Sequence, residues 1–220
     1  MKVAGIDDAG RGAIIGPLVI GGILIADKNI PNLVDIGVKD SKRLGTSRRE
    51  YLSGEIKKLA VEWHVVELSP KEIDNVVETG RKLHKLNRLE AQTMAKVIEA
   101  LKPDVVYVDA SDVVADRFGR HIAERLSFEV EIVSEHKADE KYPVVSAASI
   151  IAKVERDEAI SRLRQEYGNF GSGYPADSKT LHFLEEWIGK FEYYPDFVRK
   201  SWKPAKRLKS KAKSAQTRLL

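Results

Sequence analysis

A chain of 220 residues, 43% of them hydrophobic, is long enough to bury one substantial core. The absence of cysteine excludes disulfides, thiolate nucleophiles and cysteine-bound metals. No apolar run approaches the roughly 18 residues of a membrane span, so we expect a soluble, cytoplasmic protein without a membrane partner. The net charge of +4 is uneven, because residues 199–220 hold nine Lys and Arg and no acid, which leaves 28 bases against 33 acids in residues 1–198, a net charge of −5.

Strand-like and helix-like segments alternate along the first three quarters of the chain, and helices alone follow. Runs rich in Val and Ile predict strands, and apolar residues at helical spacing predict helices. This order indicates an α/β sheet core followed by a helical C-terminal region. In chain order the predicted elements are strands over 1–7 and 17–25, a helix ending near 60, a strand over 61–68, a long helix ending near 101, a strand over 104–109, a helix over 115–127, a strand over 129–134, and helices over 144–167 and 178–190.

Two pairs of residues have the spacing of a capping box, in which a hydroxyl and a carboxylate three residues apart satisfy the first backbone N–H groups of a helix. Ser47 and Glu50 predict the start of one helix, and Ser69 and Glu72 predict the start of another. A Gly/Pro-rich loop over 168–175 separates the last two predicted helices.

Four carboxylates lie beside predicted strands on three separate segments: Asp7 and Asp8, Asp109, and Asp139. If these strands are neighbours in one sheet, several negative charges meet, and their repulsion is costly unless a cation lies between them. Mg²⁺ and Mn²⁺ are hard cations that take oxygen ligands. The four residues are therefore candidate ligands of such cations, whereas we expect Asp112 to be a surface or capping residue.

The sequence motifs that other reaction classes require are incomplete or missing. Gly10-Arg-Gly12 with Gly16 resembles a dinucleotide-binding turn, but a β-branched run follows it instead of the required helix. The glycines are better explained by a hairpin turn whose backbone approaches a ligand closely, with Arg11 at its tip. The chain has neither a Gly-Lys-Ser/Thr phosphate loop nor a nucleophile elbow, so metal-assisted phosphodiester hydrolysis is the reaction class that fits the carboxylates.

Six short motifs follow one another between residues 5 and 175. They are Gly5-Ile-Asp-Asp-Ala-Gly-Arg-Gly12, Asp40-Ser-Lys-Arg-Leu44, Tyr107-Val-Asp109, His136-Lys-Ala-Asp139, Ser146-Ala-Ala-Ser-Ile-Ile-Ala-Lys153 and Gly171-Ser-Gly-Tyr-Pro175. Together they resemble ribonuclease HII, the type 2 ribonuclease H, in its archaeal form. The resemblance implies an RNase H-like mixed sheet flanked by helices, with a catalytic core over 1–170, a C-terminal helical region over 171–204 and a flexible basic tail over 205–220.

The same resemblance implies an endoribonuclease that hydrolyses the RNA strand of RNA/DNA hybrids. It also implies cutting 5′ of single ribonucleotides embedded in duplex DNA, which leaves a 5′-phosphate and a 3′-hydroxyl. The acidic residues of the family fall on Asp7, Asp8, Asp109 and Asp139, which would be both the catalytic residues and the ligands of a pair of Mg²⁺ or Mn²⁺ ions. Asp8 stands where the family has glutamate, so the charge remains but roughly 1.5 Å of reach is lost.

The family's substrate contacts also have counterparts in this chain. The backbone of Gly10, Arg11 and Gly12 would contact the 2′-hydroxyl side of the scissile nucleotide. Tyr174 would stack beneath the next sugar and detect a ribose-to-deoxyribose junction. The candidate phosphate contacts are Ser41, Lys42 and Lys137.

The C-terminus suggests a protein partner. Gln216-Thr-Arg-Leu219 resembles the start of the sliding-clamp-binding motif of archaeal relatives, although no aromatic residue follows it here. We expect a monomer. Two alternatives remain beside the hydrolase: another RNase H-like nuclease, such as a junction resolvase, and a non-catalytic hybrid-binding protein.

Overall fold

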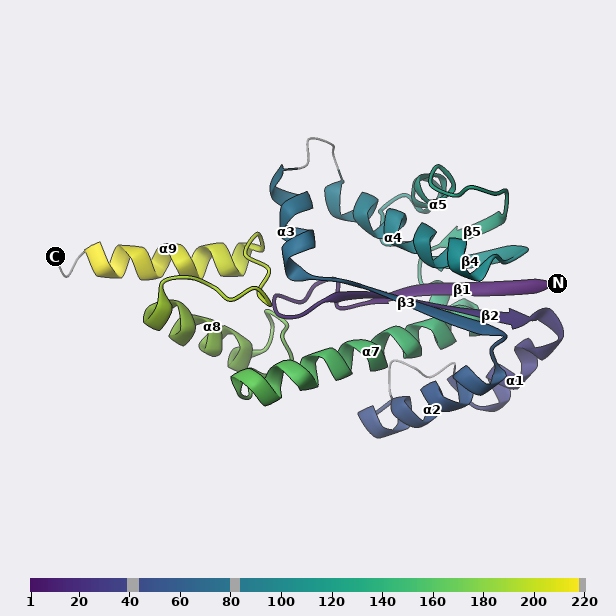
Figure 1. Cartoon of the computed structure of the whole chain (residues 1–220), viewed down its shortest axis with the longest axis horizontal. Helices are drawn as coiled ribbons and strands as arrows, with labels where there is room; N and C mark the ends of the chain where they lie inside the picture. The colour runs from purple at the N-terminus through teal and green to yellow at the C-terminus, as the bar shows by residue number, and fades with distance from the viewer. Residues whose placement is uncertain (39–43, 80–83, 218–220) are drawn as a thin grey trace. The chain divides into compact units, whose positions relative to one another are not determined.

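Five strands form one mixed sheet in the order β3-β2-β1-β4-β5 (Figure 1). The computed structural model describes residues 1–38, 44–79 and 84–217, with side chains as far as residue 214. The central strand β1 (Lys2–Ala9) pairs antiparallel with β2 (Leu18–Ala26) and parallel with β4 (Val105–Asp109). β5 (Glu131–Glu135) pairs parallel with β4, and β3 (Glu62–Leu68) lies at the other edge. The predicted α/β architecture and the predicted β1–β2 hairpin are confirmed.

Helices flank the sheet and make up the C-terminal part of the chain (Figure 1). None of the described helices combines the length and the apolar composition needed to cross a membrane. In chain order the described α-helices are α1 (Ile30–Asp35), α2 (Thr46–Leu59), α3 (Pro70–Thr79), α4 (Lys85–Leu101), α5 (Ala115–Ala123), α6 (Ala138–Lys141), α7 (Pro143–Tyr167), α8 (Ser178–Phe191) and α9 (Lys203–Thr217).

Two compact units interleave along the sequence. The described residues of unit 1 fall within Met1–Ala9, Val19–Glu67 and Leu83–Glu155, and those of unit 2 within Gly10–Leu18, Leu68–Lys82 and Arg156–Leu220. Unit 1 contains nearly all of the sheet, whereas unit 2 groups the glycine turn of the hairpin with the C-terminal helices. The segment boundaries expected from the sequence, at 170 and 204, remain a prediction.

Within unit 1, helices cover both faces of the sheet. The first turns of α7 lie so close to β1 that a Cβ on Gly5 would come within 2.6 Å of the backbone nitrogen of Val145. On the opposite face, a Cβ on Gly22 would come within 2.5 Å of Val97 on α4. Both glycines are required because a larger residue would push a helix away from the sheet.

The core of unit 2 is a cluster of aromatic and aliphatic side chains around Phe170, which is fully buried. Leu208 and Ala212 of α9 pack against this cluster, and the Tyr194 hydroxyl donates a hydrogen bond to the carbonyl of Ala205 at 3.2 Å. The structure therefore has a packed helix over Lys203–Thr217 where the sequence suggested a flexible basic tail. The apolar residues spaced four apart in this lysine-rich segment give α9 a face to bury.

The two predicted capping boxes have different outcomes. The one at the start of α3 is confirmed, because the Ser69 backbone N–H donates to Glu72 at 2.8 Å and the Glu72 N–H donates to the Ser69 hydroxyl at 3.3 Å. The one at Ser47 is wrong. α2 begins at Thr46 after an extended Gly45 that provides no side-chain cap, so Ser47 already lies inside the first turn.

Candidate active site

Parallel pairing of β1 with β4 brings Asp7 and Asp109 to the same level of the sheet. Ile6 is in register with Val108, so the residues that follow them, Asp7 and Asp109, lie on neighbouring strands where β4 ends. Asp8 follows on β1, and its backbone N–H donates to the Asp7 carboxylate at 2.7 Å. The strands expected to be neighbours are neighbours, and all of these residues belong to unit 1.

Asp7 is the most strongly perturbed of these groups. Its side chain is buried, and burial, followed by repulsion from Asp8 and from Asp109, raises its pKa well above the ordinary value. The hydrogen bond from the Asp8 N–H and the nearby Ser149 side chain on α7, whose hydroxyl has no hydrogen-bond partner among the described residues, only partly oppose this rise. Ser149 was not recognised from the sequence, where it looked like one more small residue on a packing face of the helix.

The fourth carboxylate reaches this region through a short helix. After β5 ends, Lys137 adopts a left-handed backbone with φ +56° and α6 begins at Ala138. The Ala138 backbone N–H donates to Asp109 at 2.8 Å, which ties the start of α6 to the end of β4. Asp139 is the next residue and is also buried, so the first turn of α6 delivers it to the neighbourhood of Asp109.

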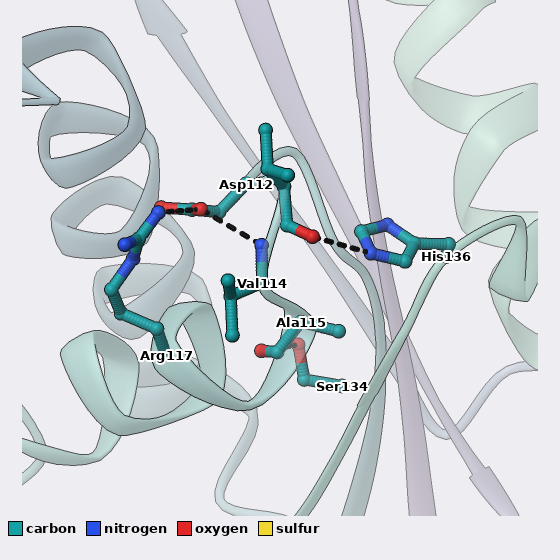
Figure 2. A network of polar contacts seen from close by, with 7 residues as sticks. Asp112, Val114, Ala115, Arg117, Ser134 and His136 are labelled. Carbon is teal, nitrogen blue, oxygen red and sulfur yellow. Dashed lines mark hydrogen bonds and ion pairs between the residues drawn. The ribbon is translucent and has the colours of Figure 1, made fainter.

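The loop that follows Asp109 is held by several hydrogen bonds, and it contacts Asp8. The Ser111 hydroxyl donates to Asp8 at 3.3 Å. Its neighbour Asp112 is buried instead of exposed, and it accepts hydrogen bonds from the Val114 backbone N–H at 3.0 Å and from Nε of Arg117 at 3.1 Å (Figure 2). Of the two expectations for Asp112, a surface position is wrong, whereas its hydrogen bond from the N–H of Val114, the residue before α5 (Ala115–Ala123), is of the capping kind. Burial opposes ionisation of Asp112, but hydrogen bonds from Arg117 and Val114 outweigh it and hold the pKa of Asp112 well below its ordinary value.

Residues of β5 and of the position that follows it also hold this loop. The Ser134 hydroxyl donates to the carbonyl of Ala115 at 3.0 Å, and Nε2 of His136 lies 3.2 Å from the carbonyl of Val113 (Figure 2). Because hydrogen bonds hold each of the four residues from Asp112 to Ala115, Ser111 is held in place beside Asp8. The two contacts from β5 have no local sequence signal.

The carboxylates have the donor chemistry of a site for hard divalent cations. Every donor is a carboxylate oxygen, and the repulsion at Asp7 is of the kind that a cation relieves. As they stand, the His, Asp and Glu side chains within the described ranges do not form a ready-made group of three or more metal ligands. A cation would therefore have to draw the carboxylates of Asp7, Asp8, Asp109 and Asp139 together.

Unit 2 contains the predicted glycine turn. Gly10 has φ +89°, a conformation that L side chains rarely adopt, and Gly12 is exposed. The fully buried Arg199 holds this turn: its guanidinium donates to the carbonyl of Arg11 at 2.8 Å and to that of Gly16 at 3.1 Å. The sequence counts Arg199 only as one of the nine bases of residues 199–220, and its role is visible only in the fold.

The predicted junction-sensing loop is joined directly to the glycine turn within unit 2. The carbonyl of Gly173 accepts from the backbone N–H of Ile14 at 2.8 Å and of Ile15 at 3.1 Å. The Gly173 N–H in turn donates to Thr180 at 3.0 Å, which holds the loop against α8. Tyr174, half-buried, is the next residue.

The predicted phosphate contacts are only partly visible. Lys137 is exposed, as a phosphate contact must be. Ser41 and Lys42 lie outside the described residues.

Comparison with known proteins assigns these features to one family. The family model for ribonuclease HII matches residues 4–205. The chain belongs to the ribonuclease HII family. It is 48% identical to ribonuclease HII of Pyrococcus abyssi over 221 residues, which covers 100% of this chain and 96% of that protein. It is 48% identical to ribonuclease HII of Thermococcus onnurineus over 96% of this chain and 91% of that protein.

Solved structures agree with this assignment. Ribonuclease H2 from Pyrococcus horikoshii superposes with a TM-score of 0.90 at 45% identity, covering 97% of this chain and 99% of that one. A ribonuclease HII from Archaeoglobus fulgidus, solved in complex with PCNA, superposes with a TM-score of 0.84 at 44% identity, covering 92% and 96%. The chain therefore has the RNase H-like fold and is an endoribonuclease of the ribonuclease H type.

Proposed function

We propose that this enzyme hydrolyses the RNA strand of RNA/DNA hybrids and cuts 5′ of a single ribonucleotide embedded in duplex DNA, leaving a 5′-phosphate and a 3′-hydroxyl. The observation that carries the proposal is the convergence of Asp7, Asp8 and Asp109 at the ends of β1 and β4, with Asp139 delivered by α6. An acidic cluster of this kind suits attack on a phosphodiester because cations bound to it neutralise the charge on the phosphate.

The four carboxylates would hold a pair of Mg²⁺ or Mn²⁺ ions. When bound, such ions activate a water and stabilise the leaving oxygen. The hydrogen bonds of the chain orient the carboxylates that would bind these ions. The Ala138 N–H restrains one oxygen of Asp109, and the Ser111 hydroxyl restrains Asp8.

Recognition of the ribose falls to unit 2 in this proposal. Gly10, Arg11 and Gly12 would present backbone groups to the 2′-hydroxyl, which distinguishes RNA from DNA at one position. Tyr174 would stack against the sugar that follows. The hydrogen bonds from Ile14 and Ile15 to Gly173 support this assignment, because they hold the two loops as one piece.

The decisive experiment uses a DNA duplex that contains one ribonucleotide, incubated with Mg²⁺ or Mn²⁺ and mapped at nucleotide resolution. Cutting 5′ of the ribonucleotide, with loss of activity in Asp109→Asn and on chelation of the metal, supports the proposal. An all-RNA/DNA hybrid, an all-DNA duplex and a four-way junction serve as comparison substrates. Cutting of the junction alone would point to a resolvase, and tight binding of the hybrid without cutting would point to a non-catalytic binding protein.

We also propose a sliding clamp as a partner. The support is the resemblance of Gln216-Thr-Arg-Leu219 to a clamp-binding motif, together with the Archaeoglobus fulgidus relative, whose structure was solved in complex with PCNA. Calorimetric titration of the cognate clamp into the chain, with and without residues 215–220, tests this partner. If no heat of binding is measured, or if the same heat is measured after truncation, the C-terminal segment does not bind the clamp.

A further inference from the structure

Arg156, in the middle of α7, is a buried arginine whose surroundings lie within unit 2. Its side chain is only 5% exposed. The guanidinium carbon lies 4.6 Å from the centroid of the Tyr174 ring, and Nη2 donates to the carbonyl of Ser172 at 3.4 Å. Among the described residues, its Nε has no hydrogen-bond partner. The face of the Tyr174 ring is therefore the main electrostatic contact that this charge makes.

The same side chain fills the space between the glycine turn and the Tyr174 loop. A Cβ on Gly10 would come within 2.6 Å of Cδ of Arg156, and a Cβ on Gly173 would lie 3.5 Å from its Nη2. The guanidinium thus runs past the α-carbons of both glycines to reach the ring of Tyr174. The glycine turn, predicted to contact the scissile nucleotide, and the Tyr174 loop, predicted to contact the next sugar, both touch this one side chain.

Burying the charged guanidinium of Arg156 costs desolvation free energy, so the presence of an arginine here needs an explanation. Burial lowers the pKa of Arg156, opposed by weaker attraction to Tyr174 and Asp157. An uncharged side chain of similar volume would fill the same space without this desolvation cost. What such a side chain lacks is a planar cation to lie over an aromatic ring, an interaction that strengthens when it is desolvated.

We propose that Arg156 is a positioning residue that holds the Tyr174 ring against the glycine turn, and that it thereby sets the dependence of cleavage on a ribose-to-deoxyribose junction. This inference rests on the proposed function, because Tyr174 must contact the sugar for its orientation to matter. Arg156 itself is too buried to touch the nucleic acid.

The test compares Arg156→Met and Arg156→Lys with Arg164→Met on a duplex with one ribonucleotide. Arg164 is a matched control, because it lies two turns further along α7 and donates to Gly171 of the same loop at 3.0 Å, but its guanidinium faces Phe170. We expect Arg156→Met to lower kcat by about thirtyfold, the size of a desolvated cation–π contact, with KM within about twofold because phosphate contacts dominate affinity. Arg156→Lys should recover part of the loss, and Arg164→Met should leave kcat near the wild-type value.

A double-mutant cycle with Tyr174→Ala separates positioning from general stability. If Arg156 acts through Tyr174, Arg156→Met causes no further loss of kcat once the ring is absent. Equal losses in both backgrounds, an equal loss in Arg164→Met, or a wild-type kcat in Arg156→Met would each overturn the inference. Should Arg156→Met unfold, Arg156→Lys in the two Tyr174 backgrounds provides the same cycle. Failure of the proposed function is distinct, because the wild-type enzyme would then not cut at a single ribonucleotide.

Discussion

Replacing Asp74 on α3 by alanine should strongly destabilise the enzyme. Asp74 is a buried carboxylate in unit 2 that ties α3 to the segment after the buried Arg199. Its two oxygens accept from the Lys200 N–H at 2.7 Å, the Ser201 N–H at 3.0 Å and the Ser201 hydroxyl at 2.5 Å. Removing the carboxylate leaves all three donors without this acceptor.

The size of the loss follows from these bonds. A hydrogen bond to a charged group contributes about 1.5–3 kcal/mol, and bonds that share one acceptor are not additive, so we expect a loss of about 3–5 kcal/mol for Asp74→Ala. For a chain of this size that corresponds to a fall in Tm of about 6 to 20 °C. Asp74→Asn keeps one acceptor oxygen and should lose about half as much free energy.

Thermal and urea unfolding, read by far-ultraviolet circular dichroism, measure the effect. Glu78→Gln is the matched control, because Glu78 lies one turn further along α3 and makes an exposed ion pair with Lys206 at 3.4 Å. An exposed pair of this kind contributes about 0–1 kcal/mol, so the control should unfold almost as the wild type does.

Cleavage of a duplex with one ribonucleotide gives a second readout. Lys200 and Ser201 directly follow Arg199, whose guanidinium holds the carbonyl of Arg11, so loosening this segment should also reduce activity at temperatures where the variant is folded. If Asp74→Ala lost no more stability than Glu78→Gln, the hydrogen bonds to Lys200 and Ser201 would not be holding the segment.

Three further predictions concern the carboxylates and the basic helix. Asp7→Asn should abolish most activity yet raise the metal-free Tm, because burial and then repulsion by Asp8 and Asp109 raise the pKa of Asp7. The contribution of Asp7 to metal-free stability is greatest below the ordinary carboxyl pKa of 3.8 and is lost as pH rises through the raised value, so the gain in Tm of the variant over the wild type should grow with pH; a lower Tm in the variant would contradict this. Asp8→Glu should keep or increase the rate under the same metal, since it restores the reach found in the family, and a clear loss would mean that the site is built around the shorter side chain. If the bases of α9 contact phosphates, Lys203→Gln combined with Arg207→Gln, both exposed on α9, should flatten the slope of log affinity for nucleic acid against log salt by about 1.8 without changing the metal dependence. An unchanged slope would mean that these two residues make no phosphate contact.

Local patterns in the sequence were sufficient for the framework of this enzyme. The β-branched runs before Asp7 and Asp109 predicted β1 and β4, and the spacing of Ser69 and Glu72 predicted the start of α3. Such patterns work because strand and helix formation depend on neighbours within a few residues. The six motifs, read as a family resemblance, then led to the family that the comparisons establish.

The supporting contacts of the site depended on tertiary structure alone. Arg199 and Arg11 are 188 positions apart, so no periodicity or spacing relates them, and a basic C-terminal segment gives no sign that one of its arginines is fully buried. The same holds for Arg156. From the sequence it is one more charged residue on a predicted helix, but in the fold it is buried against the ring of Tyr174. Sequence patterns report on local conformation and on which residue types can do chemistry. Which side chains meet, and which charges lose their water, is decided only when distant segments pack together.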